Sequence, residues 1–167
     1  MNLHYVETKN LTSNQFNEVL NLLNVCEQHD QVDIASSINV SMITKADEPH
    51  LHFILAYCED ILVGFIGLYT FVDVTKEEIA GMVLPSFRRR RIMTELINKG
   101  LVICKKRNVE EILYVCPTEL EAAKQLMGKL GAAYSFSEFT MEYKKSSTEY
   151  VHTIELIKAN EKDVQVL

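Results

Sequence analysis

Four consecutive arginines, Arg88–Arg91, stand between a segment with the pattern of a strand and a segment with the pattern of an amphipathic helix. The strand is expected over residues 77–84 and the helix over residues 88–107, with Pro85 in the turn between them. The first N–H groups of a helix have no partner inside the helix and carry partial positive charge, so they bind anions. The arrangement predicts a site for a phosphate-like anion at residues 88–94.

The charge of the chain is concentrated at this turn. Residues 1–87 carry a net charge of −9, residues 88–107 carry +7, and residues 108–167 carry −4. An acidic protein with one basic patch at a helix start favours a small polyanionic ligand. Four arginines can also bind nucleic acid, but no aromatic residues interleave with them, and we expect no nucleic-acid partner.

The same segment resembles the coenzyme-binding motif of the GNAT superfamily of acetyl-CoA-dependent N-acyltransferases. In that family a strand ending in V-x-P-x-[YF] is followed by [QR]-x-x-G-x-[GA]-[ST]-x-L. The matching residues are Val83, Pro85 and Phe87 in the first part, and Arg88, Thr94 and Leu96 in the second.

Two residues depart from the motif. Arg91 and Met93 stand where the family places glycines, which have no Cβ and let the backbone approach a pyrophosphate closely. An arginine at position 91 can instead add a phosphate contact through its guanidinium fork. The bulk of either side chain can also close the site, so both outcomes stay open.

The resemblance implies acetyl-CoA as the cofactor. Backbone groups near residues 82–84 would bind the pantetheine arm and polarise the thioester carbonyl, and the turn at residues 88–94 would hold the pyrophosphate. The sheet of this family splays between the strand ending at Leu84 and the strand ending at Cys116. The cofactor-binding residues implied are Met82, Val83, Leu84, Arg88, Arg89, Arg90, Arg91, Ile92, Met93 and Thr94.

Acetyl transfer to an amine also needs a base for the amine and an acid for the departing thiolate. Glu77 and Glu78 lie on the expected strand, and alternation lets only one of them face the cleft, although charged residues at a strand start are more often simply solvated. The family often supplies the acid as a tyrosine in A-x-x-[LF]-Y-x-x-x-G. Here that position is Met127, and Cys116 or Tyr134 are the available substitutes.

His50 and His52 are spaced to lie on one face of a strand. Two imidazoles can begin a metal site, but no third ligand has suitable spacing, and strand histidines are more often packing or surface residues. We expect no metal.

Periodicity and turn residues place the remaining elements. The sequence predicts a mixed α/β fold, as in the GNAT superfamily, with a mostly antiparallel central sheet flanked by helices. Strands are expected over residues 3–8, 51–57, 61–72, 111–116 and 134–144 (one long strand or two short ones), and helices over residues 14–27, capped by Ser13, and 119–130, ended by Gly131.

The composition fits one globular domain of 167 residues with 47% hydrophobic content. The first twenty residues have neither a basic start nor a signal-length apolar stretch, and the longest apolar run is too short to span a bilayer. The four cysteines show no C-x-x-C spacing. We therefore expect a cytoplasmic protein with reduced thiols and no membrane partner.

The last residues resemble the opening of another GNAT domain, which commonly begins I-x-[LI]-[RK]-x-A-x-x-x-D. Residues 154–163 are similar to this pattern, with Ile157 at its Arg or Lys position. The predicted organisation is a GNAT-like domain over residues 1–145 and, over residues 146–167, an extension that begins a second such domain. The alternative is a C-terminal strand that completes the sheet, in this chain or in a neighbouring copy, so a homodimer and a second domain are both open.

Two functions follow from these observations. The first is an acetyl-CoA-dependent N-acetyltransferase acting on an amine of a small molecule or a peptide. The second is a catalytically degenerate GNAT-like domain that supports a second domain or a dimer mate, as the replaced glycines and Met127 suggest. The segment that would select the acceptor, residues 30–50, has no recognisable motif.

Overall fold

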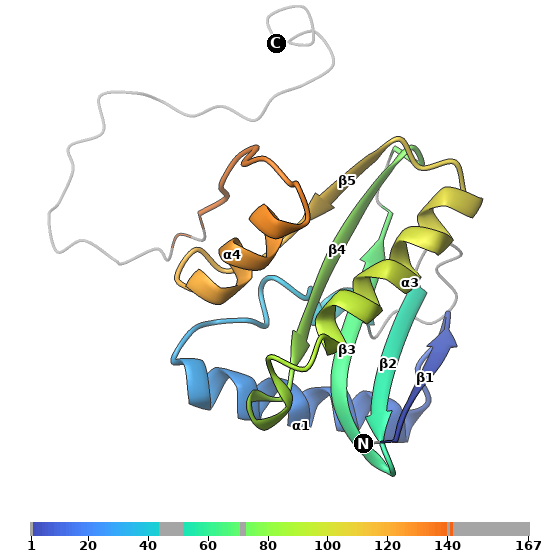
Figure 1. Cartoon of the computed structure of the whole chain (residues 1–167), viewed down its shortest axis with the longest axis vertical. Helices are drawn as coiled ribbons and strands as arrows, with labels where there is room; N and C mark the ends of the chain where they lie inside the picture. The colour runs from blue at the N-terminus through green and yellow to red at the C-terminus, as the bar shows by residue number, and fades with distance from the viewer. Residues whose placement is uncertain (1, 44–51, 71–72, 140, 142–167) are drawn as a thin grey trace, which may run out of the picture. The chain divides into compact units, whose positions relative to one another are not determined.

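The computed structural model of the chain describes residues 2–43, 52–70, 73–139 and 141. Residues 1–133 form one compact unit, and residues 134–167 form another. The first unit carries all the described helices and strands (Figure 1). Its elements are β1 (Leu3–Thr8), α1 (Ser13–Asp30), α2 (Val40–Ile43), β2 (His52–Cys58), β3 (Ile61–Tyr69), β4 (Lys76–Val83), the 3₁₀ turn η1 (Pro85–Phe87), α3 (Ile92–Lys106), β5 (Glu111–Tyr114) and α4 (Glu121–Lys129).

The strands form one sheet in the order β1-β2-β3-β4-β5. The first three pairings are antiparallel, and β4 pairs with β5 in parallel. The predicted fold class is confirmed: a mixed, mostly antiparallel sheet with helices on its faces. Strands β2 and β3 form a hairpin, with Glu59 and Asp60 as its turn.

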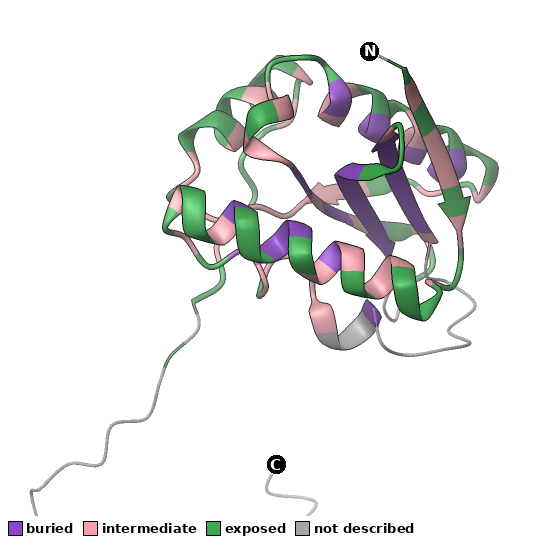
Figure 2. Ribbon diagram, turned by 90° about the horizontal axis from the view of Figure 1, so that it is seen from below, coloured by how far each residue is buried: buried purple, intermediate pink, exposed green. Residues whose placement is uncertain are grey.

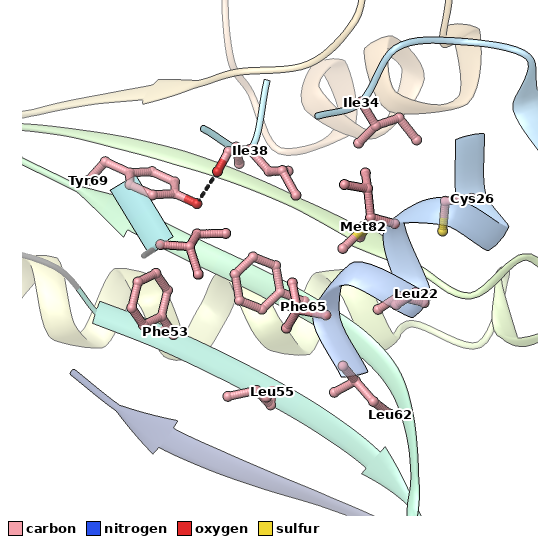
Figure 3. Close-up of a cluster of buried hydrophobic side chains, with 14 of the residues drawn as sticks. Leu22, Cys26, Ile34, Ile38, Phe53, Leu55, Leu62, Phe65, Tyr69 and Met82 are labelled. Atoms are coloured by element: carbon pink, nitrogen blue, oxygen red, sulfur yellow. Dashed lines mark hydrogen bonds between the residues drawn. The ribbon is translucent and has the colours of Figure 1, made fainter. Parts of the chain in front are cut away.

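Helices cover the central strands on both faces, and this explains why β2 and β3 are almost continuously apolar (Figure 2). One face packs against α1 and the segment that follows it (Figure 3), and the other packs against α3. Gly100 of α3 is buried against the sheet, and a Cβ there would lie 3.2 Å from Ile66 Cδ1. Glycine at this position lets α3 approach the sheet closely.

Helix α1 starts one residue earlier than predicted, and its N-cap is Thr12, where Ser13 was expected. The Thr12 hydroxyl accepts the Gln15 N–H at 3.2 Å, and Gln15 Oε1 accepts the Thr12 N–H at 3.0 Å. Gln15 stands three residues after Thr12, so this pair forms a capping box that Ser13 cannot make. At its other end α1 runs to Asp30, where Gln31 adopts a left-handed conformation.

The helix predicted from residue 88 begins only at Ile92. Arg89 and Arg91 both have φ of 63°, a left-handed conformation that cannot continue a right-handed helix. Residues 88–91 are therefore a turn between η1 and α3. Strands β4 and β5 end one and two residues earlier than predicted, at Val83 and Tyr114.

After β5, helix α4 spans Glu121–Lys129, where a helix over residues 119–130 was predicted. Helix α4 is present, and Gly131 ends it with φ of 81° while the Ala132 N–H bonds the Met127 carbonyl at 3.1 Å. Within the predicted strand 134–144, the described residues 134–139 and 141 are not in a strand. The resemblance of residues 154–163 to a second domain lies outside the described residues.

Candidate functional site

Strands β4 and β5 separate part of the way along β4. Their pairing runs from Lys76–Glu111 to Ile79–Tyr114, and the last bond across them is from the Val115 N–H to the Ile79 carbonyl, at 2.9 Å. In the described part of the chain, the remaining residues of β4, 80–83, pair with β3 alone. Figure 1 shows β5 diverging from β4 at this point. The predicted splay is therefore present in the sheet.

Strand alternation decides which backbone groups of β4 face this opening. The Leu84 N–H bonds the Val63 carbonyl at 2.9 Å, so the groups of Leu84, and of Met82 two residues earlier, point toward β3. The Ile79 carbonyl points toward β5, and so do the groups of Gly81 and Val83. Among the predicted residues Met82, Val83 and Leu84, the N–H group of Val83 alone faces the opening.

Sequence reasoning missed Gly81, whose backbone faces the opening beside Val83. Its distance of two residues from Val83 was a usable signal, because residues two apart on a strand share a direction. A Cβ at Gly81 would also press on the Phe65 carbonyl and on Ile66. Glycine at this position therefore permits the close pairing of β4 with β3.

The Val83 carbonyl is already bonded within the protein. It accepts Arg88 Nε at 3.0 Å and the Cys26 thiol at 3.5 Å. The described residues provide no partner for the Val83 N–H, which is left as a hydrogen-bond donor on the open edge of β4.

The Arg88 guanidinium forms a two-pronged ion pair with Asp30 at the end of α1. Nη1 donates to Oδ1 at 2.7 Å, and Nη2 donates to Oδ2 at 2.6 Å. The Asp30 side chain is only 9% exposed. Hydrogen bonding to Arg88 is the main reason that the pKa of Asp30 lies below its ordinary value, so the pair is ionised at neutral pH. Together with the bond to Val83, these contacts use three of the five N–H donors of Arg88.

Arg89 and Arg91, in the turn before α3, adopt positive φ, a conformation that glycine adopts most easily. Arg91 is the N-cap residue of α3, and its side chain makes no hydrogen bond to the N–H groups of the first helical turn. The first intrahelical bond of α3 runs from the Glu95 N–H to the Arg91 carbonyl at 3.0 Å. The three preceding N–H groups, of Ile92, Met93 and Thr94, lie in the first turn, where an α-helix offers them no acceptor.

The side chains around this turn leave its outer surface polar. Arg89, Arg90 and Arg91 are exposed, and the Arg90 guanidinium lies 5.1 Å from the centre of the Phe87 ring. Met93 is partly buried and packs against the hydrophobic cluster between α3 and the sheet. The two residues that replace the motif glycines thus point in different directions: Arg91 toward solvent, Met93 toward the core.

Glu77 and Glu78 point to opposite faces of the sheet. Glu77 is 1% exposed, accepts the Thr70 hydroxyl at 2.6 Å and pairs with Arg107 Nη1 at 3.2 Å. It lies on the α3 face with Ile79, inside an ion pair. Glu78 is half-buried and, by alternation, lies on the α1 face with Ala80 and Met82.

No proton donor is evident at the position of the family's tyrosine. Met127 lies on α4 and is partly exposed. Cys116 follows β5, and burial raises the pKa of its thiol. Tyr134 belongs to the second unit, where it is 80% exposed and donates to Ser137 Oγ at 3.0 Å.

The other sequence signals add little to this site. His52 is at the start of β2, while His50 lies outside the described residues. Across the part of the chain that the structure describes, no group of three potential metal ligands occurs. In the same residues, no helix combines the length and apolar character needed to cross a membrane.

Comparison with known proteins identifies the class to which this fold and opening belong. The family model described as "Acetyltransferase (GNAT) family" matches residues 16–132, more than half of the chain. The chain therefore belongs to the GNAT family of acetyltransferases, which transfer an acetyl group from acetyl-CoA to an amine. No curated protein sequence matches the chain.

Solved structures of acetyltransferases share the fold at low sequence identity. An acetyltransferase of the GNAT family from Staphylococcus aureus Mu50 has a TM-score of 0.66 at 17% identity, covering 78% of this chain and 84% of that chain. The ribosomal-protein-alanine N-acetyltransferase from Brucella melitensis biovar Abortus 2308 has a TM-score of 0.63 at 16% identity, covering 86% and 100%. The enzyme AAC(6')-Iy, in complex with the bisubstrate analogue CoA-S-monomethyl-acetylneamine, has a TM-score of 0.54 at 18% identity, covering 87% and 99%.

Proposed function

We propose that this chain is an acetyl-CoA-dependent N-acetyltransferase that holds the coenzyme along the open edge of β4 and at the start of α3. The observation that carries the proposal is the placement of two sets of N–H donors on either side of η1. The Val83 N–H faces the opening between β4 and β5, and the N–H groups of residues 92–94 form the uncapped start of α3. One elongated ligand with an acyl thioester at one end and phosphates further along matches both sets.

In this arrangement the Val83 N–H donates to the thioester carbonyl oxygen, and the Gly81 backbone bonds the pantetheine arm. A donor aimed at this oxygen stabilises the charge that develops there when the amine attacks. The pyrophosphate lies at residues 89–94. Arg89, Arg90 and Arg91 surround it, and their positive charge adds to that of the helix start.

Glu78 is the better of the two candidate bases. Its side chain shares the α1 face with the segment after α1, from which we expect the acceptor to be selected, whereas Glu77 is paired with Arg107 on the opposite face. The acceptor is an amine of a small molecule or a peptide. The relatives act on such amines, as the ribosomal-protein-alanine N-acetyltransferase does by its name. Cytoplasmic location remains a prediction.

The proposal is tested by calorimetric titration of the purified chain with acetyl-CoA and, separately, with pantetheine. Acetyl-CoA should bind, with an affinity that falls as salt rises, and pantetheine should bind far more weakly because it lacks the pyrophosphate. At about a hundred times its dissociation constant, acetyl-CoA should also add roughly 2.7 kcal/mol to the free energy of unfolding.

A matched pair of variants tests the role of the α3 start. Met93→Pro removes one N–H group at a position in the first helical turn, where proline is tolerated, and Met93→Ala keeps that group while removing the same side chain. Binding should be weaker in the proline variant than in the alanine variant. If the parent chain shows neither binding nor stabilisation at millimolar acetyl-CoA, the degenerate domain is the correct function.

A further inference from the structure

Asp30, Arg88 and Val83 form a continuous set of contacts, here called the clasp. The Asp30 carboxylate bonds both terminal nitrogens of Arg88, and Arg88 Nε bonds the Val83 carbonyl. The clasp thereby joins the last residue of α1, the last residue of β4 and the first residue of the turn at 88–91. All three belong to the compact unit of residues 1–133.

A second contact supports the clasp from the preceding turn of α1. The Cys26 thiol, which is fully buried, donates to the same Val83 carbonyl. Cys26 stands four residues before Asp30, so the two side chains lie on the same face of α1. The end of α1 is therefore held against Val83 by two separate contacts.

The end of α1 also holds the segment that follows it. Glu27 Oε1 accepts the N–H groups of Ile34 and Ala35, each at 2.9 Å. Further along, the Ile38 carbonyl accepts the Tyr69 hydroxyl at 2.5 Å. The beginning of this segment is thus positioned by the same helix turn that carries Asp30.

Fixing the Val83 carbonyl also orients the Val83 N–H. In an extended strand the N–H and C=O groups of one residue point to the same side. A carbonyl held by Arg88 and Cys26 cannot rotate without breaking both bonds, and the N–H on the open edge keeps its direction. Arg88 also begins the turn at 88–91, so a single carboxylate secures both ends of the proposed coenzyme site.

We infer that Asp30 is a positioning residue for acetyl transfer, which through Arg88 holds the Val83 amide, the turn at 88–91 and the segment after α1 in one arrangement. This role rests on the proposed function. The carboxylate acts through Arg88, and its ionised state is secured by the same contact.

The test compares Asp30→Asn with Asp33→Asn in the full chain. Both changes remove one negative charge within four residues, but Asp33 is exposed and, among the described residues, accepts the Ser36 N–H at 3.1 Å and makes no contact with Arg88 or Val83. Two quantities are measured well below the unfolding temperature: the dissociation constant for acetyl-CoA, and the rate of amide hydrogen exchange in peptides covering residues 79–94 and 27–38.

Asp30→Asn should raise the dissociation constant about tenfold, the equivalent of roughly 1.4 kcal/mol, and should accelerate exchange in both peptides. Asp33→Asn should leave the dissociation constant unchanged. Asp30→Glu keeps the charge and should recover part of the loss, and this variant serves as the second measurement if the asparagine variant folds poorly.

The two proposals fail in different ways. A parent chain that binds acetyl-CoA, together with an Asp30→Asn variant of equal affinity and equal exchange, overturns the positioning role and leaves the proposed function standing. A parent chain that does not bind acetyl-CoA overturns both.

Discussion

The ring of Tyr69 lies across Gly67 on the same strand, and it fills the space that any side chain at position 67 would need. From there the Tyr69 hydroxyl reaches the Ile38 carbonyl at 2.5 Å (Figure 3). The glycine thus provides the room for a tyrosine that ties β3 to the segment between α1 and α2. Tyr69 is 1% exposed, and burial raises the pKa of its hydroxyl well above the ordinary value, so it remains a donor at any physiological pH.

Gly67→Ala should destabilise the protein through a clash with Tyr69. Overpacking of this kind typically costs about 1–3 kcal/mol, measured as the free energy of unfolding in denaturant. The same substitution should cost less in a Tyr69→Ala background, because the ring that it strikes is then absent. Equal costs in the two backgrounds would show that Tyr69 is not what excludes a side chain at position 67.

Tyr69→Phe should keep the packing and remove only the bond to Ile38. The buried Ile38 carbonyl is then left without its hydrogen-bond donor, which costs about 1–3 kcal/mol. Amide exchange at residues 34–40 should accelerate more than exchange in α3, which packs on the other face of the sheet. Uniform acceleration across both regions would argue against a local role for the hydroxyl.

Arg91→Gly should stabilise the protein, because it relieves a left-handed conformation at a residue with a side chain. Such a conformation costs roughly 1–2 kcal/mol for a non-glycine residue, and part of this gain is offset by the greater entropy of a glycine in the unfolded chain. A net increase of about 0.5–1 kcal/mol in the free energy of unfolding is expected.

The matched control is Arg90→Gly, which removes the same charge at a neighbouring residue that does not have positive φ. That variant should be neutral or destabilised, and it also loses the contact with Phe87. If the two variants change the stability equally, backbone strain at Arg91 is not the cause. The affinity of Arg91→Gly for acetyl-CoA then measures how far the arginine side chain substitutes for the glycine of the motif.

Replacement by glutamine should mainly lower the stability at position 77 and mainly lower the activity at position 78. Glu77→Gln weakens a buried ion pair with Arg107, so we expect a loss of about 1–3 kcal/mol in stability with little change in acetyl-CoA affinity. Glu78→Gln should lower kcat by about a hundredfold or more, as expected for loss of a general base.

The measurements for this pair are denaturant unfolding and the rate of CoA thiol release with an acceptor amine identified by screening. A Glu78→Gln variant with unchanged kcat would remove Glu78 from the mechanism. A Glu77→Gln variant that keeps its stability but loses its activity would exchange the roles proposed for the two carboxylates.

The order of the elements from β1 to α4, apart from the short α2 and η1, was predicted from the sequence because it depends on local patterns. The location of the opening was implied by the resemblance to the GNAT family. The apolar runs of β2 and β3, the turn at Pro85 and the glycine that ends α4 all act within a few residues. The Thr12 cap was missed although its signal was local, since Gln15 stands three residues later. The spacing of Thr12 and Gln15 is that of a capping box, which predicts Thr12 as the N-cap.

The roles of Arg88 and Glu77 could not have been predicted in the same way. Arg88 was expected among the coenzyme-binding residues, and the partner that its guanidinium has in the structure, Asp30, is separated from it by 58 residues. Glu77 was expected to be either solvated or catalytic, and Arg107 pairs with it from 30 residues away. No periodicity or motif encodes such pairs, because they arise only when the sheet brings α1 and the end of α3 to its two faces.

His52 gives a final prediction, on the dependence of stability on pH. Its Nε2 atom is buried and has no hydrogen-bond partner among the described residues. Burial lowers the pKa of His52, Arg107 and Lys9 lower it further, and Glu7 partly opposes them. In the folded protein the imidazole is therefore neutral at a pH where the unfolded chain, with an ordinary value of about 6.5, already binds a proton.

The unfolded state thus binds more protons than the folded state as the pH falls below about 6.5, and the contribution of His52 to stability is lost in that direction. Replacement by phenylalanine, which keeps a ring but cannot titrate, should flatten this part of the profile. The measurement is the free energy of unfolding of parent and His52→Phe between about pH 7.5 and 5, with the difference between the two curves cancelling the other histidines. If the difference in the free energy of unfolding is constant across this range, the pKa of His52 is the same in the folded and unfolded states.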